Sequence, residues 1–191
     1  MKKQIYGILL FVLIIIISIL VVVAPAFLSE HTAAVKAEQE LNLPLILNDD
    51  KNIQLIFFGY STCVDVCIPR LKKLSQLYNS LDKKIKDQVG ILFIDISVPA
   101  DPQQPSKYVR SFNPDFKGLY LNKTAVREYI QAFRVFSSRS LVNKAEYNHS
   151  SYLYLVEKKG QKKWLRYIYK TAPYPLEKIK DNIKELIGET S

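Results

Sequence analysis

The sequence predicts an α/β fold, a mixed β-sheet flanked by helices, preceded by one N-terminal transmembrane helix. Apolar runs of strand length alternate with stretches of helical periodicity. Two more apolar runs near the C-terminus flank Lys158-Lys159-Gly160 and predict a hairpin. A βαβ beginning, followed by a helix, a hairpin and a terminal helix, is the arrangement of a thioredoxin-like fold.

The N-terminal segment predicts a membrane anchor. No charged residue occurs from Gln4 to Ser29, and a helix of roughly 20 apolar residues crosses a hydrocarbon core of about 30 Å. Lys2 and Lys3 would stay in the cytoplasm by the positive-inside rule, which directs the remainder of the chain outward. The alternative is a cleaved signal peptide ending at Ala24-Pro25-Ala26, but the apolar run exceeds the usual signal core of about 7 to 15 residues, which favours an uncleaved anchor.

The chain is therefore expected to have three parts. Residues 1–29 form a cytoplasmic stub and transmembrane anchor, residues 30–44 a juxtamembrane linker, and residues 45–191 one thioredoxin-like domain large enough to bury its own core. Nothing in the sequence resembles an Arg- and Ser-rich transit peptide. We expect a single-pass protein of a bacterial inner membrane, with its C-terminal domain in the periplasm or on the outer face.

Periodicity and turn residues predict the elements of the domain. The expected strands are Leu45 to Leu47, Ile53 to Phe58, Val89 to Ile96, Leu119 to Leu121, Ser151 to Val156 and Trp164 to Tyr169. The expected helices are a helix or linker from Glu30 to Asn42, a helix through Leu71, Leu74, Tyr78 and Leu81, a short helix near Ser106 to Phe112, a helix from Thr124 to Phe136 capped near Asn122 or Lys123, and a last helix opened by Pro175. Asn48 to Asp50 is expected to be a turn.

The charge of the chain is strongly basic. The net charge is +9, and without Lys2 and Lys3 it is +7. Basic residues alternate with aromatic ones around Trp164, a composition that nucleic-acid-binding proteins share. On an exported, tethered domain this pattern favours a solvated hairpin or a surface held against anionic headgroups, and no nucleic-acid partner is expected.

The only two cysteines lie together as Cys63-Val64-Asp65-Val66-Cys67, between the apolar run Ile53 to Phe58 and the helix that follows. Thiols at a helix N-terminus meet the positive end of the helix dipole, which favours the thiolate. Thiolates are the form that metals and disulfide chemistry require. The alternative is two small apolar core residues, since free cysteines are commonly buried; the absence of any other cysteine favours a site.

Two segments resemble the Sco/SenC family of membrane-anchored copper proteins: Phe57-Phe58-Gly59-Tyr60-Ser61-Thr62-Cys63-Val64-Asp65-Val66-Cys67 and Asn148-His149-Ser150-Ser151-Tyr152-Leu153-Tyr154-Leu155. The resemblance implies a thioredoxin-like copper-binding domain with Cys63, Cys67 and His149 as the metal ligands. It implies copper as Cu(I) and/or Cu(II), and the copper-bearing subunit of cytochrome c oxidase as the partner. Ser97, Val98 and Asp101-Pro102 are similar to the acidic loop after the family's next strand, whereas Val64 stands where the family usually has proline.

The donor types support this resemblance. Thiolate and imidazole suit copper, and thiolates favour Cu(I), whereas zinc would need a fourth ligand. Asp65 could supply a fourth ligand, but we expect it to accept backbone N–H bonds at the helix start. His149 alone could be a polar loop residue; with the cysteine pair upstream, a ligand is favoured. His31, in the juxtamembrane segment, is expected to be solvated.

Three functional hypotheses follow. The first is a tethered copper chaperone that needs its cysteines reduced for loading, because a disulfide bond would empty the site. The second is an exported thiol-disulfide oxidoreductase with Cys63 and Cys67 as its redox-active pair. Such enzymes typically have Cys-x-x-Cys and a proline facing the pair, which this chain lacks. The third, a peroxide-reducing enzyme, would need a Thr/Arg arrangement around Cys63 that the sequence does not supply. We therefore expect a binding protein rather than an enzyme.

Overall fold

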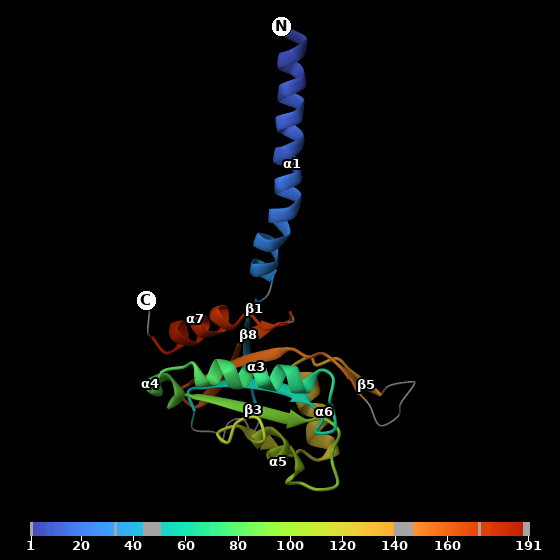
Figure 1. Cartoon of the computed structure of the whole chain (residues 1–191). Helices are drawn as coiled ribbons and strands as arrows, with labels where there is room; N and C mark the ends of the chain where they lie inside the picture. The colour runs from blue at the N-terminus through green and yellow to red at the C-terminus, as the bar shows by residue number, and fades with distance from the viewer. Residues whose placement is uncertain (1, 33, 44–50, 140–146, 172, 189–191) are drawn as a thin grey trace. The chain divides into compact units, whose positions relative to one another are not determined.

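A computed structural model describes residues 2–32, 34–43, 51–139, 147–171 and 173–188. The chain divides into two compact units, Met1–Ala34 and Val35–Ser191, and each is considered by itself. The first unit contains the helix α1 (Lys2–Thr32) (Figure 1). Across the described residues, no helix combines the length and the apolar character needed to span a membrane.

The second unit is built on a six-stranded mixed sheet in the order β1-β8-β7-β2-β3-β4. Its strands are β1 (Ala34–Leu41), β2 (Ile53–Gly59), β3 (Val89–Asp95), β4 (Lys117–Leu119), β7 (Leu153–Lys159) and β8 (Lys162–Tyr169). β3 is parallel to both β2 and β4, whereas β7 is antiparallel to β2 and to β8. A separate antiparallel pair consists of β5 (Ser137–Arg139) and β6 (Tyr147–His149).

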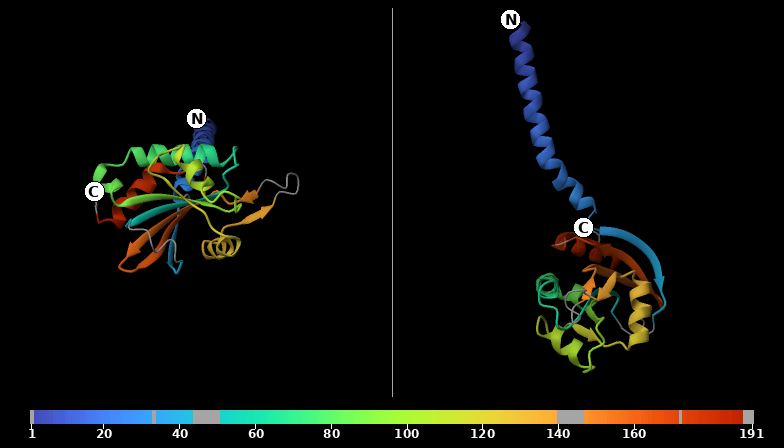
Figure 2. Two further views of the ribbon diagram at one scale, coloured as in Figure 1. Left: turned by 90° about the horizontal axis from the view of Figure 1, so that it is seen from below. Right: turned by 90° about the vertical axis from the view of Figure 1, so that its right-hand side faces the viewer.

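Helices cover both faces of the sheet (Figure 2). Successive side chains of a strand point to opposite faces, so the residues of β2, all of which are buried, serve two cores. Ile56 and Phe58 pack in one core with residues of α6 (Lys123–Ala132). On the other side, Phe57 lies near Cys67 of α3 (Cys67–Asn79). Asn182 of α7 (Leu176–Leu186) donates a hydrogen bond to the hydroxyl of Tyr169 in β8 at 2.8 Å. Two short helices, α4 (Lys83–Lys86) and α5 (Gln104–Arg110), precede β3 and β4, respectively, in the chain.

Most of the predicted elements are confirmed. The two apolar runs form β2 and β3 side by side in parallel, and the C-terminal runs form the β7–β8 hairpin, with Gly160 at a positive φ of 64° in its turn. Asn122 caps α6 by accepting a hydrogen bond from the backbone N–H of Ala125 at 2.9 Å. The helix expected to reach Phe136 ends at Ala132. The strand expected at Leu45 to Leu47 and the turn at Asn48 to Asp50 lie outside the described residues.

The helix or linker expected at Glu30 to Asn42 is wrong for most of that segment, which forms the edge strand β1. Alanines suggested a helix, but the segment alternates with a period of two. Ala37 and Leu41 pack against the core, while Glu38 and Glu40 form ion pairs at 2.9 Å with Arg166 and Lys162 of β8. Side-chain pairing with a neighbouring strand therefore outweighs helix propensity here.

Gly118 in β4 should be intolerant of any side chain. A methyl group there would collide with the carbonyl group of Pro105 and the backbone nitrogen of Ser106, at the start of α5. We predict that Gly118→Ala lowers the free energy of unfolding by about 1–3 kcal/mol or more, because two backbones would have to separate. Chemical denaturation measures the effect. Gly90→Ala is the matched control, because a methyl group there would lie 3.2 and 3.6 Å from side-chain carbons of Lys51 and no nearer than 4.0 Å to the carbonyl oxygen of Ile53. An equal loss in both variants would contradict the explanation.

Candidate metal centre

The two cysteines lie where the strand β2 gives way to the helix α3. β2 ends at Gly59, Cys63 follows in a turn in which its N–H donates to the carbonyl of Tyr60 at 2.9 Å, and Cys67 is the first residue of α3. Both cysteines are buried and neither forms a disulfide. The end of β2 thus places both sulfurs at the carboxyl edge of the parallel part of the sheet, as the sequence predicts.

The sulfur of Cys63 takes the position that a capping side chain often occupies. The residue preceding α3, Val66, has no side chain able to cap the helix, and the N–H of Cys67 points at Sγ of Cys63 at 3.4 Å. A helix N-terminus favours negative charge. The hydrogen bonds from the Cys67 thiol and from this N-terminus lower the pKa of Cys63 well below its ordinary value.

Cys67 has the opposite tendency. Its hydrogen bond to Cys63, together with its burial, raises the pKa of the Cys67 thiol. The two sulfurs therefore share one proton, with the charge on Cys63 and the hydrogen on Cys67. The pair presents one nucleophilic thiolate and one thiol, rather than two equivalent groups.

Glycine at position 59 allows Cys67 to approach the sheet. A methyl group on Gly59 would lie 2.8 Å from Sγ of Cys67 and 2.9 Å from the ring of Phe93. Distances this short do not occur between real atoms of these types, so any larger residue would push the sulfur away. Gly59 is thus a requirement of the site's geometry.

His149 lies close to the cysteines although it follows Cys67 by 82 residues in the sequence. It is the last residue of β6, where it pairs with Ser137 of β5. Its ring lies edge-on to Tyr60, with ring centres 5.8 Å apart, and to Phe57 at 6.5 Å. Nδ1 lies 3.2 Å from the carbonyl oxygen of Ser150, which leaves Nε2 directed at the cysteines. Nε2 lies 4.0 Å from Sγ of Cys67.

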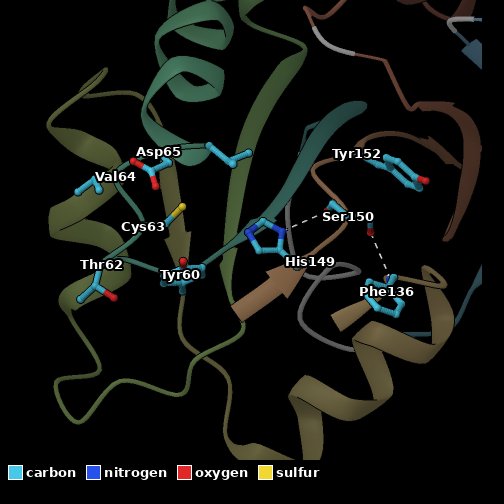
Figure 3. A pocket seen from close by; sticks show the side chains of 10 residues that line it. Tyr60, Thr62, Cys63, Val64, Asp65, Phe136, His149, Ser150 and Tyr152 are labelled. Atoms are coloured by element: carbon cyan, nitrogen blue, oxygen red, sulfur yellow. Dashed lines mark hydrogen bonds between the residues drawn. The ribbon is translucent and has the colours of Figure 1, made fainter. Parts of the chain in front are cut away.

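The ligand atoms of Cys63, Cys67 and His149 all lie within 4.8 Å of one another. Cys63 and His149 lie next to each other in the lining of an open pocket of about 480 Å³, which Asp65 and Tyr152 also line (Figure 3). Small shifts of the side chains would bring the three atoms to bonding distance of one ion. The arrangement provides two sulfurs and one imidazole nitrogen, with an opening to solvent on one side.

Two further contacts hold the cysteine loop in place. The buried carboxylate of Asp95, at the end of β3, accepts hydrogen bonds from the N–H of Ser61 at 3.0 Å and from its hydroxyl. The other oxygen of Asp95 accepts from the N–H and hydroxyl of Ser97, at 2.8 and 2.6 Å. From α5, the hydroxyl of Tyr108 donates to the carbonyl of Cys63 at 3.0 Å, and burial raises the pKa of Tyr108, which keeps this donor protonated.

The other residues that the sequence singled out are not part of this group. Asp65 lines the pocket without belonging to the cluster of three, and the expected capping hydrogen bond is not found at the N-cap of α3, which is Val66. Asp101 is exposed and pairs with Lys107 at 2.9 Å, an ion pair that lowers its pKa. Ser97 serves Asp95. His31 belongs to the first unit and is not placed relative to the site.

Sequence reasoning missed Gly59, Asp95 and Tyr108 as supports of the site. Asp95 had a visible signal, because it is the only charged residue in an otherwise apolar strand. No sequence signal identified Tyr108, since its hydrogen bond to Cys63 depends on how α5 packs against the cysteine loop. The two-stranded pair that carries His149 was missed as well, because each of its strands has only three residues.

A family model described as SCO1/SenC matches residues 49–188. An SCO2-like protein of Rickettsia conorii is 33% identical over 132 residues, which are 65% of this chain and 63% of the relative. Protein sco1 of Schizosaccharomyces pombe is 31% identical over 121 residues, 60% of this chain and 46% of the relative. The matches therefore span less than two thirds of the length of these relatives.

Solved structures have the same fold. The apo Sco1 protein of Thermus thermophilus is 25% identical with a TM-score of 0.63, covering 80% of this chain and 92% of the other. Bradyrhizobium japonicum ScoI, solved with copper bound, is 23% identical with a TM-score of 0.58, covering 80% and 99%. BsSco, described as a member of the Sco family of cytochrome c oxidase assembly proteins with a disulfide switch, is 20% identical with a TM-score of 0.53, covering 73% and 82%. The thioredoxin-like α/β fold is thereby confirmed.

The unequal thiols lead to a prediction about alkylation. In the reduced protein, iodoacetamide should modify Cys63 much faster than Cys67, because the pKa of Cys63 is lowered and that of Cys67 is raised. Between about pH 6 and pH 8 the rate at Cys63 should change little, since the thiolate is already formed. Peptide mass spectrometry measures both sites. In urea the two cysteines should react alike, with rates rising toward a pH of about 8.5; equal rates in the folded protein would contradict a shared proton.

Proposed function

Because the chain belongs to the SCO1/SenC family, we propose that it holds one copper ion through Cys63, Cys67 and His149 and passes that ion to the copper centre of cytochrome c oxidase. The observation that carries the proposal is the convergence of these three ligand atoms within 4.8 Å. Copper is the cargo of the protein in this proposal, so the site must both bind it and release it.

The chemistry of the three ligands supports copper over zinc. Two thiolates and one imidazole suit Cu(I), which accepts soft ligands and low coordination numbers. A structural zinc ion would require a fourth ligand, and the described residues bring no other histidine, cysteine or carboxylate into the cluster. The pocket leaves one side of the site accessible, which an exchange of ligands with a partner protein requires.

The difference in pKa between the two thiols indicates how the site takes up copper. Cys63 is available as a thiolate, whereas Cys67 must lose its proton when the metal binds. Because the pKa of Cys67 is raised, copper competes with a proton at that sulfur, and the affinity for copper is expected to rise with pH. Oxidation of the pair to a disulfide removes both sulfur ligands at once.

The partner and the membrane tether are the further parts of the proposal. BsSco is described as a member of the Sco family of cytochrome c oxidase assembly proteins, and a shared membrane face would bring donor and acceptor together. The tether rests on the sequence, in which no charged residue occurs from Gln4 to Ser29. Large apolar side chains of α1, among them Phe11 and Ile17, are exposed. We propose an outward-facing domain on a bacterial inner membrane.

A second candidate is a thiol-disulfide oxidoreductase, favoured by one observation. A thiolate next to a protonated thiol is the arrangement in which one cysteine attacks and the other resolves. Catalytic reduction of insulin disulfides by the full-length protein, with turnover lost in Cys63→Ser but kept in His149→Ala, would favour this candidate. Absence of turnover, together with copper binding that requires His149, would exclude it.

For the copper site, we predict that Cys63→Ser, Cys67→Ser and His149→Ala each lower the affinity of the reduced protein for Cu(I) by at least about 10-fold. Each substitution removes one of three ligands, and among the described residues no other donor is positioned to replace it. Competition with a chromophoric Cu(I) chelator measures the affinity. Cu(II), if bound, should show an intense thiolate charge-transfer band that disappears in the Cys63→Ser/Cys67→Ser variant.

Asp65→Asn is the matched control for the copper measurement, because Asp65 lines the same pocket outside the cluster of three. It should bind copper like the parent. Stoichiometric binding in the double cysteine variant, with the parent's affinity and spectrum, would refute the proposed function.

For the tether, we predict that the full chain stays in the membrane fraction after washing at high salt and at alkaline pH. Ile14→Arg/Ile15→Arg should release it, because each arginine at the centre of a bilayer costs about 2.5–3.5 kcal/mol. Fractionation and immunoblotting measure the distribution. The control Lys158→Ala/Lys159→Ala should remain bound; its release by salt would show instead that surface charge holds the protein to the membrane.

A further inference from the structure

The first turn of α3 carries a buried arginine that contacts the segment following His149. Arg70 is only 9% exposed and lies three residues after Cys67, so both side chains leave the same face of the helix. Nη2 of Arg70 donates to the hydroxyl oxygen of Ser151 at 3.3 Å. Nη1 donates to the carbonyl oxygen of Thr171 at 3.2 Å. One turn of helix therefore carries a cysteine of the site and a contact to the segment of its histidine.

Tyr174 holds the same serine through a different atom. The Tyr174 hydroxyl donates to the carbonyl oxygen of Ser151 at 2.8 Å, and its ring lies 4.4 Å from the guanidinium carbon of Arg70. Tyr174 is 3% exposed. Arg70 and Tyr174 together form a clamp on Ser151, one through its side chain and the other through its backbone.

The charge of this clamp is unusual for a buried position. Burying a guanidinium costs free energy unless its charge is compensated, and within the described part of the chain no carboxylate forms an ion pair with Arg70. A carbonyl, a hydroxyl and an aromatic face compensate it instead. An apolar side chain would fill the position without this cost, which indicates that the hydrogen bonds themselves are needed.

The clamp completes the fixation of the backbone after His149. Ser150 is held by Phe136, the residue before β5. The N–H of Ser150 donates to the carbonyl of Phe136 at 2.9 Å, and its hydroxyl accepts from the N–H of Phe136 at 3.2 Å. Ser151, the next residue, is held by Arg70 and Tyr174. The two residues that follow His149 are therefore fixed by elements on different sides, and the second of them is tied to the helical turn that begins with Cys67.

We infer that Arg70 and Tyr174 are positioning residues that set the separation between Nε2 of His149 and Sγ of Cys67, 4.0 Å, and thereby prepare the site for copper. This inference rests on the proposed function for its role in copper binding. A ligand that is already positioned does not need to be ordered when the metal binds, so less of the binding free energy is lost.

Copper affinity of the full-length reduced protein tests the inference. Arg70→Ala should weaken Cu(I) binding by about 10- to 100-fold, the usual effect of removing a group that orients a metal ligand. Tyr174→Phe, which removes a single oxygen atom, should weaken it less, and Arg70→Lys, whose one nitrogen reaches one acceptor, should give an intermediate value. Lys73→Ala, an exposed position on the same helix, is the matched control and should bind like the parent.

Measuring Arg70→Ala also in the protein that carries His149→Ala separates an effect on the position of His149 from a general loss of structure. In His149→Ala, adding Arg70→Ala should cause no further loss of affinity, because the clamp acts through His149. An equal loss in both backgrounds would overturn the inference. If Arg70→Ala does not fold, Tyr174→Phe carries the same comparison.

Hydrogen exchange of the metal-free protein provides a readout that does not depend on copper. The Ser150 amide should exchange faster in Arg70→Ala and in Tyr174→Phe than in the parent, with amides of β3 unchanged. If the parent fails to bind copper, the proposed function is wrong while this measurement still tests the clamp. Unchanged exchange of Ser150 in both variants would overturn the clamp whatever the result for copper.

Discussion

The site depends on the contact between the first turn of α3 and the end of β2. The sulfur of Cys67 lies so close to the backbone of Gly59 that only hydrogen fits between them. This contact fixes the direction in which α3 leaves the sheet, and with it the positions of Cys63 and Arg70. A helix that started one residue later or left the sheet in another direction would separate the sulfurs from the imidazole, since His149 lies 82 residues after Cys67 and is held by other elements.

The same helix start also decides the chemistry of the pair. The hydrogen bond between the two side chains, followed by the N–H of Cys67 at the start of α3, lowers the pKa of Cys63, while the same side-chain bond and then burial raise the pKa of Cys67. An equivalent pair in water would be two weakly acidic thiols with similar behaviour. Because the fold distinguishes them, a metal or an oxidant meets one reactive sulfur first and a second one close behind it, and both the chaperone and the oxidoreductase proposals depend on that order.

Much of the fold and of the site could be predicted from the sequence, for reasons that differ between elements. β2 and β3 are continuous apolar runs of strand length, and α6 and α7 show helical periodicity, so local patterns were sufficient. The cysteine pair and His149 were identified by residue type and by resemblance to a family. β1 was missed because its alanines suggested a helix, and the edge pairing that overrides them is not a local property. Tyr108, Arg70 and Tyr174 could not be found, since each acts on a residue distant in sequence.

The carboxylate of Asp95 has a consequence for how this sequence can change over time. Its two oxygens accept from both the backbone and the side chain of Ser61 and of Ser97, so the loop that leads to Cys63 and the loop that follows β3 share one buried anchor. Replacing Asp95 alone would leave two backbone N–H groups and two hydroxyls without this acceptor, whereas replacing either serine would remove only one hydroxyl donor, because the backbone N–H remains. Position 95 should therefore change far less readily than positions 61 and 97, and a lineage that loses this carboxylate should carry compensating changes in both loops.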